Sequence, residues 1–229
     1  MSAAFERVVI CEPPSPLYRF FDRPEYAQML CDGQIRLSTL SFCRQCEEPG
    51  RGDAGEGQAT YHRGHISGTT DDPAFMAQVE NTGVLKFTVP PGWEAPRTEV
   101  SLSNITYNDR LPDAYVLCVT ERDDPNALAE FGPRCVCISE PVSLFDALSR
   151  AINQQVPLGK AALGPIHYAD RHREDDERRH RCPAFVKPPD TYREQREVRF
   201  LWIAADPDHM YVPTVLDLPE LRHHFRQLR

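Results

Sequence analysis

The sequence predicts an α+β fold, with mixed, mostly antiparallel sheets and short helices, in a single domain over residues 1–229. Short apolar runs typical of strands recur along the chain. Segments with the apolar spacing of amphipathic helices lie between them. The 21 prolines exceed the usual share of ~5%, which predicts many loops and short elements.

The first elements predicted are strand, strand, helix, strand. VVICE and LYRFF have strand character. The segment PEYAQMLCDG predicts a helix, because Pro24 suits a first turn and Gly33 a stop. IRLSTLSF then alternates as a strand.

The middle of the chain is less regular. Residues 43–70 are polar and rich in glycine and charge, which predicts a long loop region. DPAFMAQVEN predicts a helix and VLKFTV a strand, followed by a variable stretch to Arg110.

The second half alternates strands and helices. PVSLFDALSRAINQ has the clearest apolar helix face, and residues 171–182 form a charged excursion. The strands predicted are DAYVLCVT, RCVCISE, PIHYAD, REVRFLWIA and MYVPTVL, and the further helices are NALAEFG and LPELRHHFRQLR.

Charge and cysteine content limit the class of protein. A net charge of −8 disfavours non-specific binding to nucleic acid or anionic lipid. There is no apolar run of ~18 residues, and the N-terminus lacks signal-peptide character. We therefore expect a cytoplasmic protein, no membrane partner, and eight cysteines present as thiols.

An acidic pair precedes the strand REVRFLWIA. Glu194 and Glu197 lie three residues apart, and alternation puts Glu197 and Arg199 on one strand face. Glu197 and Arg199 can form an ion pair on a solvent-exposed face. Alternatively, Glu197 can be a carboxylate at the mouth of a cleft.

Two earlier segments carry further candidates. Arg19 follows Tyr18 in an apolar run, so it must reach solvent, pair with an acid or hold a ligand. Ser38 and Thr39 are adjacent hydroxyls in a strand, where bonding to neighbouring backbone is the common outcome.

The order of these segments resembles the Arg, Ser-Thr-Ser, Glu pattern of the cholera-toxin-like ADP-ribosyltransferases. Gln195 precedes Glu197 as in the Gln-x-Glu variant of that family. The resemblance implies that Arg19 binds the phosphates of NAD, that Ser38, with Thr39 nearby, orients the cleft, and that Glu197 stabilises the cationic ribose as nicotinamide leaves.

A second resemblance overlaps the first. LYRFF, CDGQIRLSTLSFCR, RGDAGEG and YREQREVRF resemble a loosely defined group of bacterial proteins of uncertain activity, some linked to abortive infection. This second resemblance adds Asp53, Glu56 and Tyr192 as candidates, and Arg51 at the start of RGDAGEG is a further candidate. In a transferase of the first family, Tyr192 would stack on nicotinamide. Either acid of RGDAGEG could anchor Arg19 or Arg199, and a solvated turn is the alternative.

A zinc site competes for the polar region. Cys43 and Cys46, followed by His62 and His65, have the residue types of a zinc finger. The histidine spacing is shorter than usual and no helical pattern lies between the pairs, so we expect no metal.

The sequence thus predicts a transferase, also a glycosyltransferase in the broad sense, that moves ADP-ribose from NAD to a macromolecule, protein or nucleic acid. The resemblances imply a toxin or an antiviral defence role. The alternatives are a non-enzymatic binding or regulatory module with a structural ion network, and a zinc-stabilised nucleic-acid-binding protein.

Overall fold

The computed structural model describes residues 4–46, 52–85, 88, 92, 96–124, 126, 128–175, 177, 178, 180 and 182–229. The chain divides into two compact units. Unit 1 comprises Met1–Glu56, Pro112–Ala169 and Lys187–Arg229, and unit 2 comprises Gly57–Leu111 and Asp170–Val186.

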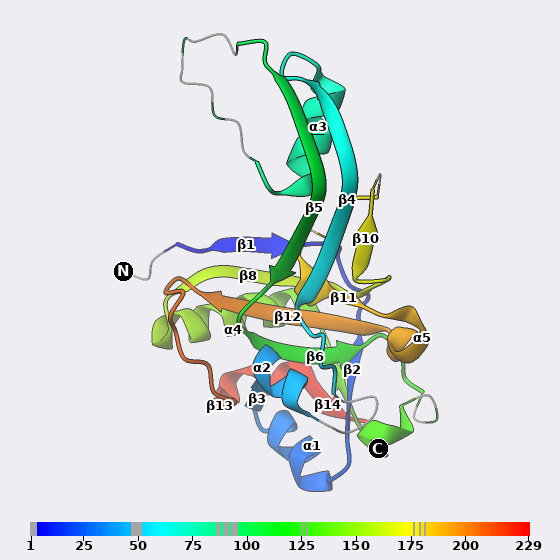
Figure 1. Ribbon diagram of the computed structural model, residues 1–229. Coiled ribbons are helices and arrows are strands. Elements are labelled where there is room, and N and C mark those ends of the chain that lie inside the picture. Colours follow the sequence, from blue (N-terminus) through cyan, green and yellow to red (C-terminus); the bar gives the residue numbers. More distant parts are fainter. Residues whose placement is uncertain are drawn as a thin grey trace. The chain divides into compact units, whose positions relative to one another are not determined.

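Unit 1 is built on a large mixed sheet whose strand order, among the described residues, is β1-β8-β12-β6-β2-β7-β14, with β3 joined to β6 and β13 to β3 (Figure 1). Only the β1–β8 pairing of this sheet is parallel in the described residues, which confirms the predicted mixed, mostly antiparallel α+β fold. The strands are β1 (Glu6–Val9), β2 (Leu17–Phe21), β3 (Gln34–Thr39), β6 (Tyr115–Thr120), β7 (Arg134–Ile138), β8 (Leu158–Pro165), β12 (Glu197–Ala204), β13 (Thr214–Asp217) and β14 (Phe225–Gln227).

Apart from α4, which has 15 residues, the remaining elements of unit 1 are short, as the proline content predicted. The α-helices are α1 (Pro24–Cys31), α2 (Leu40–Gln45), α4 (Pro141–Gln155) and α5 (Pro189–Tyr192), and the 3-10 helices are η1 (Ala129–Phe131), η3 (Arg193–Gln195) and η4 (Pro219–His224). Two short strands, β9 (His167–Tyr168) and β11 (Val186–Lys187), pair with each other.

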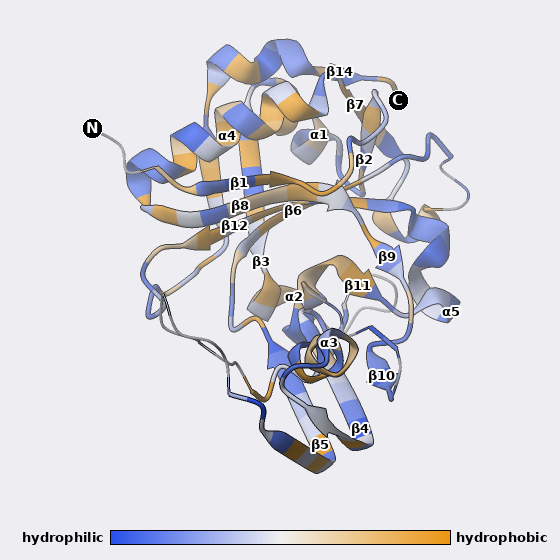
Figure 2. Ribbon diagram, turned by 90° about the horizontal axis from the view of Figure 1, so that it is seen from above, coloured by the Kyte–Doolittle hydropathy of each residue, from blue (hydrophilic) through white to orange (hydrophobic). Residues whose placement is uncertain are grey.

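The core of unit 1 lies between α4 and the sheet. Alternate residues of β12, including Phe200 and Trp202, face α4, where Phe145 lies 6.0 Å from the Phe200 ring. The Trp202 indole N–H donates to the Ser149 hydroxyl at 2.8 Å, so the buried polar atom is satisfied. Figure 2 shows α4 running along the sheet at β1, β8 and β12.

The sheet splits at β6. One end of β6 pairs with β3 through Ser38 and Thr39, and the other end pairs with β2 through Tyr18. The branches β3–β13 and β2–β7–β14 therefore separate beyond β6.

The turn between α1 and β3 requires glycine. Gly33 has φ +86°, and an added Cβ would lie 2.4 Å from the carbonyl oxygen of Leu218. We expect Gly33→Ala to destabilise unit 1 by about 1–3 kcal/mol, the usual cost of a strained backbone conformation. Chemical denaturation checks this, with Gly64→Ala as control, because a Cβ there meets only Asp175 at 3.7 Å. Equal stability of the two variants would contradict the expectation.

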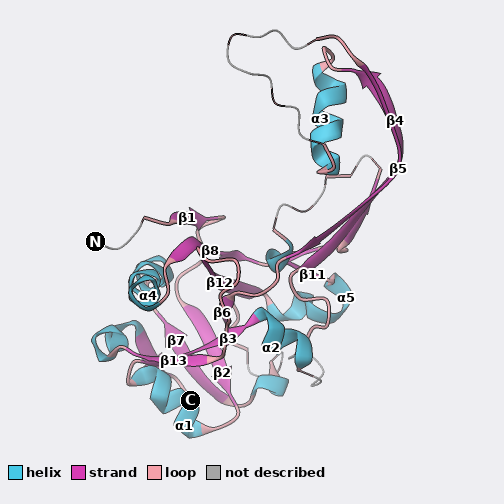
Figure 3. Cartoon of the chain, turned by 60° about the vertical axis from the view of Figure 1, so that its left-hand side comes forward, coloured by secondary structure: helices cyan, strands magenta, loops and turns pink. Residues whose placement is uncertain are grey.

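Unit 2 is a long hairpin covered by a helix. The elements are β4 (Gln58–Thr69), β5 (Glu99–Arg110), β10 (His172–Glu174), α3 (Pro73–Thr82) and the 3-10 helix η2 (Pro183–Phe185). Phe75 and Val79 of α3 pack on Ile66 and Ile105 of the two long strands, and Figure 3 shows α3 alongside them.

The loop predicted for residues 43–70 is wrong for residues 58–69, which form β4, and the variable stretch before Arg110 is β5. Glycine within β4 is the reason that the sequence pattern did not predict a strand there. A Cβ on Gly68 would lie 2.5 Å from the Phe75 ring, so the strand carries glycine where α3 approaches. The predicted terminal helix is also wrong, because η4 ends at His224 and β14 pairs with β7.

Candidate functional site

Glu197 and Arg199 face away from the α4 core on β12, as the alternation predicted. The exposed-face interpretation fails for this pair, because Glu197 is 5% exposed and Arg199 1%. Pairing with β6 and β8 satisfies the backbone of β12 at both edges, and Glu56 and Lys187 contact the two side chains on this face. Glu197 begins the strand, and its backbone N–H donates to the Tyr168 hydroxyl at 2.7 Å.

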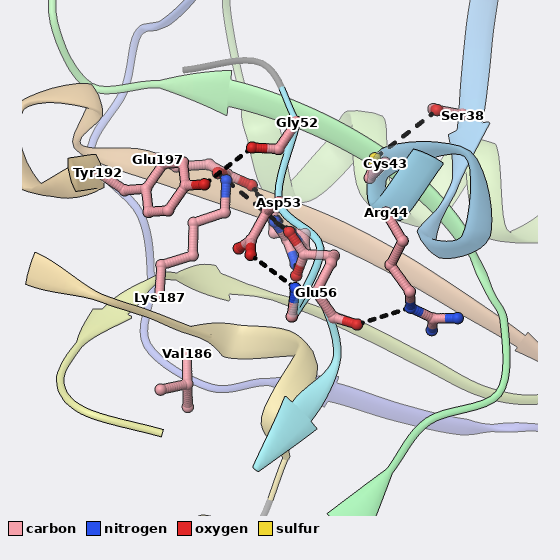
Figure 4. Close-up of polar contacts among 12 residues, drawn as sticks. Ser38, Cys43, Arg44, Gly52, Asp53, Glu56, Val186, Lys187, Tyr192 and Glu197 are labelled. Atoms are coloured by element: carbon pink, nitrogen blue, oxygen red, sulfur yellow. Dashed lines mark hydrogen bonds and ion pairs between the residues drawn. The ribbon is translucent and has the colours of Figure 1, made fainter. Parts of the chain in front are cut away.

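Four buried charged residues form an ion cluster: Glu56, Lys187, Glu197 and Arg199. Arg199 binds Glu56 through Nη1 at 2.6 Å and Glu197 through Nη2 at 2.7 Å. Lys187 Nζ lies 2.6 Å from the second carboxylate oxygen of Glu197 and 3.8 Å from Glu56. Two cations thus neutralise two carboxylates, the condition for keeping charges buried. Figure 4 shows Lys187, Glu56 and Glu197 converging.

The cluster keeps Glu197 ionised. Burial by itself favours the neutral acid, but the charges of Arg199 and Lys187 outweigh it and lower the pKa of Glu197 to about 2. Burial likewise opposes the charged form of Lys187, yet Glu197 raises the pKa of that amine above its usual value. A fixed carboxylate of this kind is suited to stabilising a cation.

The lowered pKa predicts acid lability. The pKa of Glu197 falls from the ordinary 4.5 to about 2 on folding, so its stabilising contribution is complete above pH 4.5 and is lost as the pH falls towards 2. We expect the urea midpoint of the wild type to drop across this window. Glu197→Gln should show a smaller drop there, and an equal drop in both proteins would contradict the assignment.

The turn that carries Glu56 is held by backbone and arginine contacts. The Asp53 N–H donates to the Cys43 carbonyl at 3.1 Å, and Arg44 Nε donates to the Glu56 carbonyl at 2.8 Å. The Asp53 carboxylate accepts from the Gly55 N–H at 3.1 Å and stabilises the turn. The sequence left open whether Asp53 or Glu56 anchors Arg19 or Arg199. In the structure Glu56 pairs with Arg199. Arg51 lies outside the described residues.

A cavity of about 760 Å³ opens at the split of the sheet. This volume is within the range of about 300–1,000 Å³ typical of small-molecule sites. Arg19 and Glu197, from opposite ends of the sequence, both line it, together with Tyr18, Glu56 and Arg199. An apolar wall is contributed by Phe21, Tyr26, Met29, Leu30, Leu128 and Phe131.

Ser38 is not among the residues that line this cavity, although its strand β3 contributes to the lining. Gln34 and Arg36 line the cavity, and Ser38 follows at the same period of two on β3. The Ser38 hydroxyl lies 3.9 Å from the Cys43 thiol, itself a lining residue. Thr39 instead caps α2, accepting from the Phe42 N–H at 3.1 Å, so its role is structural.

Tyr192 and Glu194 lie outside the cavity lining. The Tyr192 hydroxyl donates to the Gly52 carbonyl at 2.8 Å, and Lys187 Nζ lies 4.8 Å from the ring centre, so the ring supports the amine of the ion cluster. Glu194 is 74% exposed and pairs with Arg122 at 2.7 Å. The stacking role implied for Tyr192 has no support in this placement.

Arg36 and Lys187 line the cavity, but the sequence pattern gave neither a role. A lysine within the apolar run PAFVKPP was the available signal for Lys187, because buried lysines need a partner. Arg36 is separated from Ser38 by one residue, so strand alternation could have placed it on the same face.

The cavity thiols are poor nucleophiles. Burial raises the pKa of Cys43 and raises that of Cys118 well above its ordinary value. Both groups therefore stay protonated at neutral pH, and the thiolate is the reactive form.

The described residues contain no group of three or more His, Cys, Asp or Glu placed to hold a metal ion. His62 lies 3.3 Å from the Thr106 hydroxyl, and His65 lies 2.9 Å from the Ser103 hydroxyl. No helix in the described part of the chain is long and apolar enough to cross a membrane.

The fold and site define an α+β protein with a charged cavity where its main sheet divides. No family model, curated protein or solved structure matches the chain.

Proposed function

We propose that this protein is an ADP-ribosyltransferase that transfers ADP-ribose from NAD to a macromolecule. The observation that supports this most is the shared cavity of Arg19 and Glu197. A guanidinium suits the phosphates of a dinucleotide. A buried, ionised carboxylate suits the positive charge that develops on the ribose.

The reaction breaks the bond between ribose C1′ and the pyridinium nitrogen. The bonding electron pair leaves with nicotinamide, which becomes neutral, and C1′ acquires oxocarbenium character. Glu197 stabilises that cation. A lone pair of the acceptor then forms the new bond to C1′, and the acceptor loses its proton to solvent.

The remaining residues position the substrate. Arg19 binds phosphate from β2, and Ser38 orients the cleft from β3 on the other branch of the sheet. Because the two strands belong to separate branches, a dinucleotide between them contacts both. The apolar wall formed by α1, Phe21 and Phe131 accommodates an aromatic ring.

A macromolecular acceptor in the cytoplasm, protein or nucleic acid, completes the proposal. A toxin or phage-defence role follows from the family resemblance.

One observation favours a second candidate, a non-enzymatic binding module. Both carboxylate oxygens of Glu197 already lie within 2.7 Å of a cation. In that case the ion cluster is structural, and NAD remains uncleaved.

The test is incubation of the protein with NAD labelled in the adenylate part, with and without bacterial lysate. Release of nicotinamide and label in macromolecules support the transferase. NAD recovered intact with each of several lysates, from protein whose fold is verified by circular dichroism, favours the binding module.

A further inference from the structure

Arg19 and Arg36 are two cationic side chains that meet in one cavity from adjacent branches of the sheet. Both line the space at the split, Arg19 from β2 and Arg36 from β3. Arg19 Nη1 donates to the backbone carbonyl of Arg36 at 3.4 Å. The Arg19 guanidinium also lies over the Phe21 ring, 5.3 Å from its centre, and that of Arg36 over Phe42 at 5.8 Å.

Among the residues that the structure describes, no carboxylate pairs with either guanidinium. Within the described residues, neither Arg19 nor Arg36 forms an ion pair, whereas Lys187 and Arg199 share Glu56 and Glu197. Asp22 is the remaining acid of the lining, and it too forms no ion pair there. The ion cluster is neutral as a unit, so the arginine pair gives its part of the cavity an excess of positive charge.

Arg19 is half-buried and has no carboxylate partner among the described residues, whereas Arg36 is exposed to solvent. Burial, with a smaller contribution from the charge of Arg36, lowers the pKa of Arg19 to about 10. Burial and the charge of Arg36 both disfavour the charged form of the Arg19 guanidinium. A bound anion would stabilise that charged form. The planar guanidinium forms paired hydrogen bonds with phosphate oxygens, so two of them suit two linked phosphates.

We propose that Arg36 acts with Arg19 as a subsite for a diphosphate group, with one guanidinium for each phosphate. Arg36 is then the residue that selects diphosphates over monophosphates. This inference rests on the proposed function for the identity of the natural ligand, but binding can be measured without catalysis. The adjoining apolar wall, including Tyr26 and Phe131, gives the nucleoside of such a ligand a surface to contact.

The experiment is calorimetric titration of the full-length protein with ADP, AMP and inorganic pyrophosphate. We expect ADP to bind at least ~10-fold more tightly than AMP, since charge-assisted hydrogen bonds are the strong class. Arg36→Gln should remove most of this preference, because it weakens the binding of ADP and leaves the affinity for AMP nearly unchanged. Asp22→Asn should increase the affinity for ADP. The substitution removes a negative charge that forms no ion pair within the described lining of the cavity.

The matched control is Arg150→Gln, which removes one positive charge from the exposed face of α4, outside this cavity. It should bind ADP as the wild type does. Equal affinity of the wild type for ADP and AMP would overturn the subsite. So would an Arg36→Gln variant that keeps the preference, or an equal loss in the Arg150 control.

The outcomes separate the subsite from the transferase. Arg36-dependent ADP binding in a protein that leaves NAD intact retains the subsite and rejects the proposed function. Nicotinamide release with a KM that Arg36→Gln does not change retains the function and rejects the subsite.

Discussion

Glu197→Gln is expected to lower nicotinamide release from NAD by about 10²–10³-fold, the usual loss when one group that stabilises transition-state charge is removed. The amide has nearly the same shape but no charge. It therefore cannot stabilise the oxocarbenium-like ribose. Because the proposal assigns the NAD phosphates to Arg19, we expect a large fall in kcat and a small change in KM.

The matched control is Glu194→Gln. It makes the same chemical change three residues earlier, at a side chain that is 74% exposed and pairs with Arg122. Nicotinamide release should then stay within about twofold of the wild type. The transferase proposal fails if Glu197→Gln cleaves NAD at the wild-type rate, or if the Glu194 control loses as much activity.

Folding of the Glu197 variant has to be verified separately. Removing the carboxylate leaves Lys187 without its closest acid and leaves Arg199 paired with Glu56 alone. Some loss of stability is therefore expected. Retained ADP binding would show that the cavity survives, so that a loss of nicotinamide release reports on the chemical step.

Local sequence patterns were sufficient for β2, α1, β6 and β12 of unit 1, but the predicted strand IRLSTLSF is wrong after Thr39, because Leu40–Gln45 form α2. Alternation in REVRFLWIA separated the core residues Val198, Phe200 and Trp202 from Glu197 and Arg199, and the structure confirms that division. Pro24 and Gly33 marked the ends of α1 within two residues. These signals are local, since periodicity and turn chemistry depend on neighbouring residues.

Burial and partners could not be predicted in this way. Strand alternation places Glu197 and Arg199 on one face, but it cannot show that this face is covered. Here Glu56 comes from a turn before unit 2 and Lys187 from the return of the chain after it. Pairing over such separations is a property of the fold, and the sequence offered only a lysine in an apolar run.

The long strands of unit 2 were missed for a different reason. The apolar positions of β4 include Ala59, Tyr61 and Ile66, whose spacing changes parity between Tyr61 and Ile66. The pairing with β5 keeps one register across that interval, with Arg63 opposite Ile105 and His65 opposite Ser103, so Tyr61 and Ile66 lie on opposite faces of the hairpin. A strand that shifts its inward face produces no continuous alternation, so pattern analysis indicated a loop.

Arg199→Met is expected to cause the largest loss of stability, about 3–5 kcal/mol, because it leaves buried carboxylates without their shared cation. Arg199 is 1% exposed and binds both Glu56 and Glu197, and methionine supplies a similar apolar stem without charge. Denaturant unfolding at pH 7 measures the change. The control is Arg122→Met, which breaks the exposed pair with Glu194 and should cost ~1 kcal/mol or less.

The double variant Glu56→Gln with Arg199→Met separates electrostatics from lost contacts. It removes one of the two stranded carboxylates and leaves Lys187 to pair with Glu197, so part of the stability should return. The difference in free energy of unfolding between the wild type and Arg199→Met should also become smaller as the pH falls from 4.5 towards 2. In this window the wild type loses the contribution of Glu197, whose pKa of about 2 depends on Arg199 and Lys187. A difference that stays constant with pH, together with no recovery in the double variant, would assign the effect of Arg199 to side-chain contacts and remove the electrostatic basis for an ionised Glu197 in the cavity.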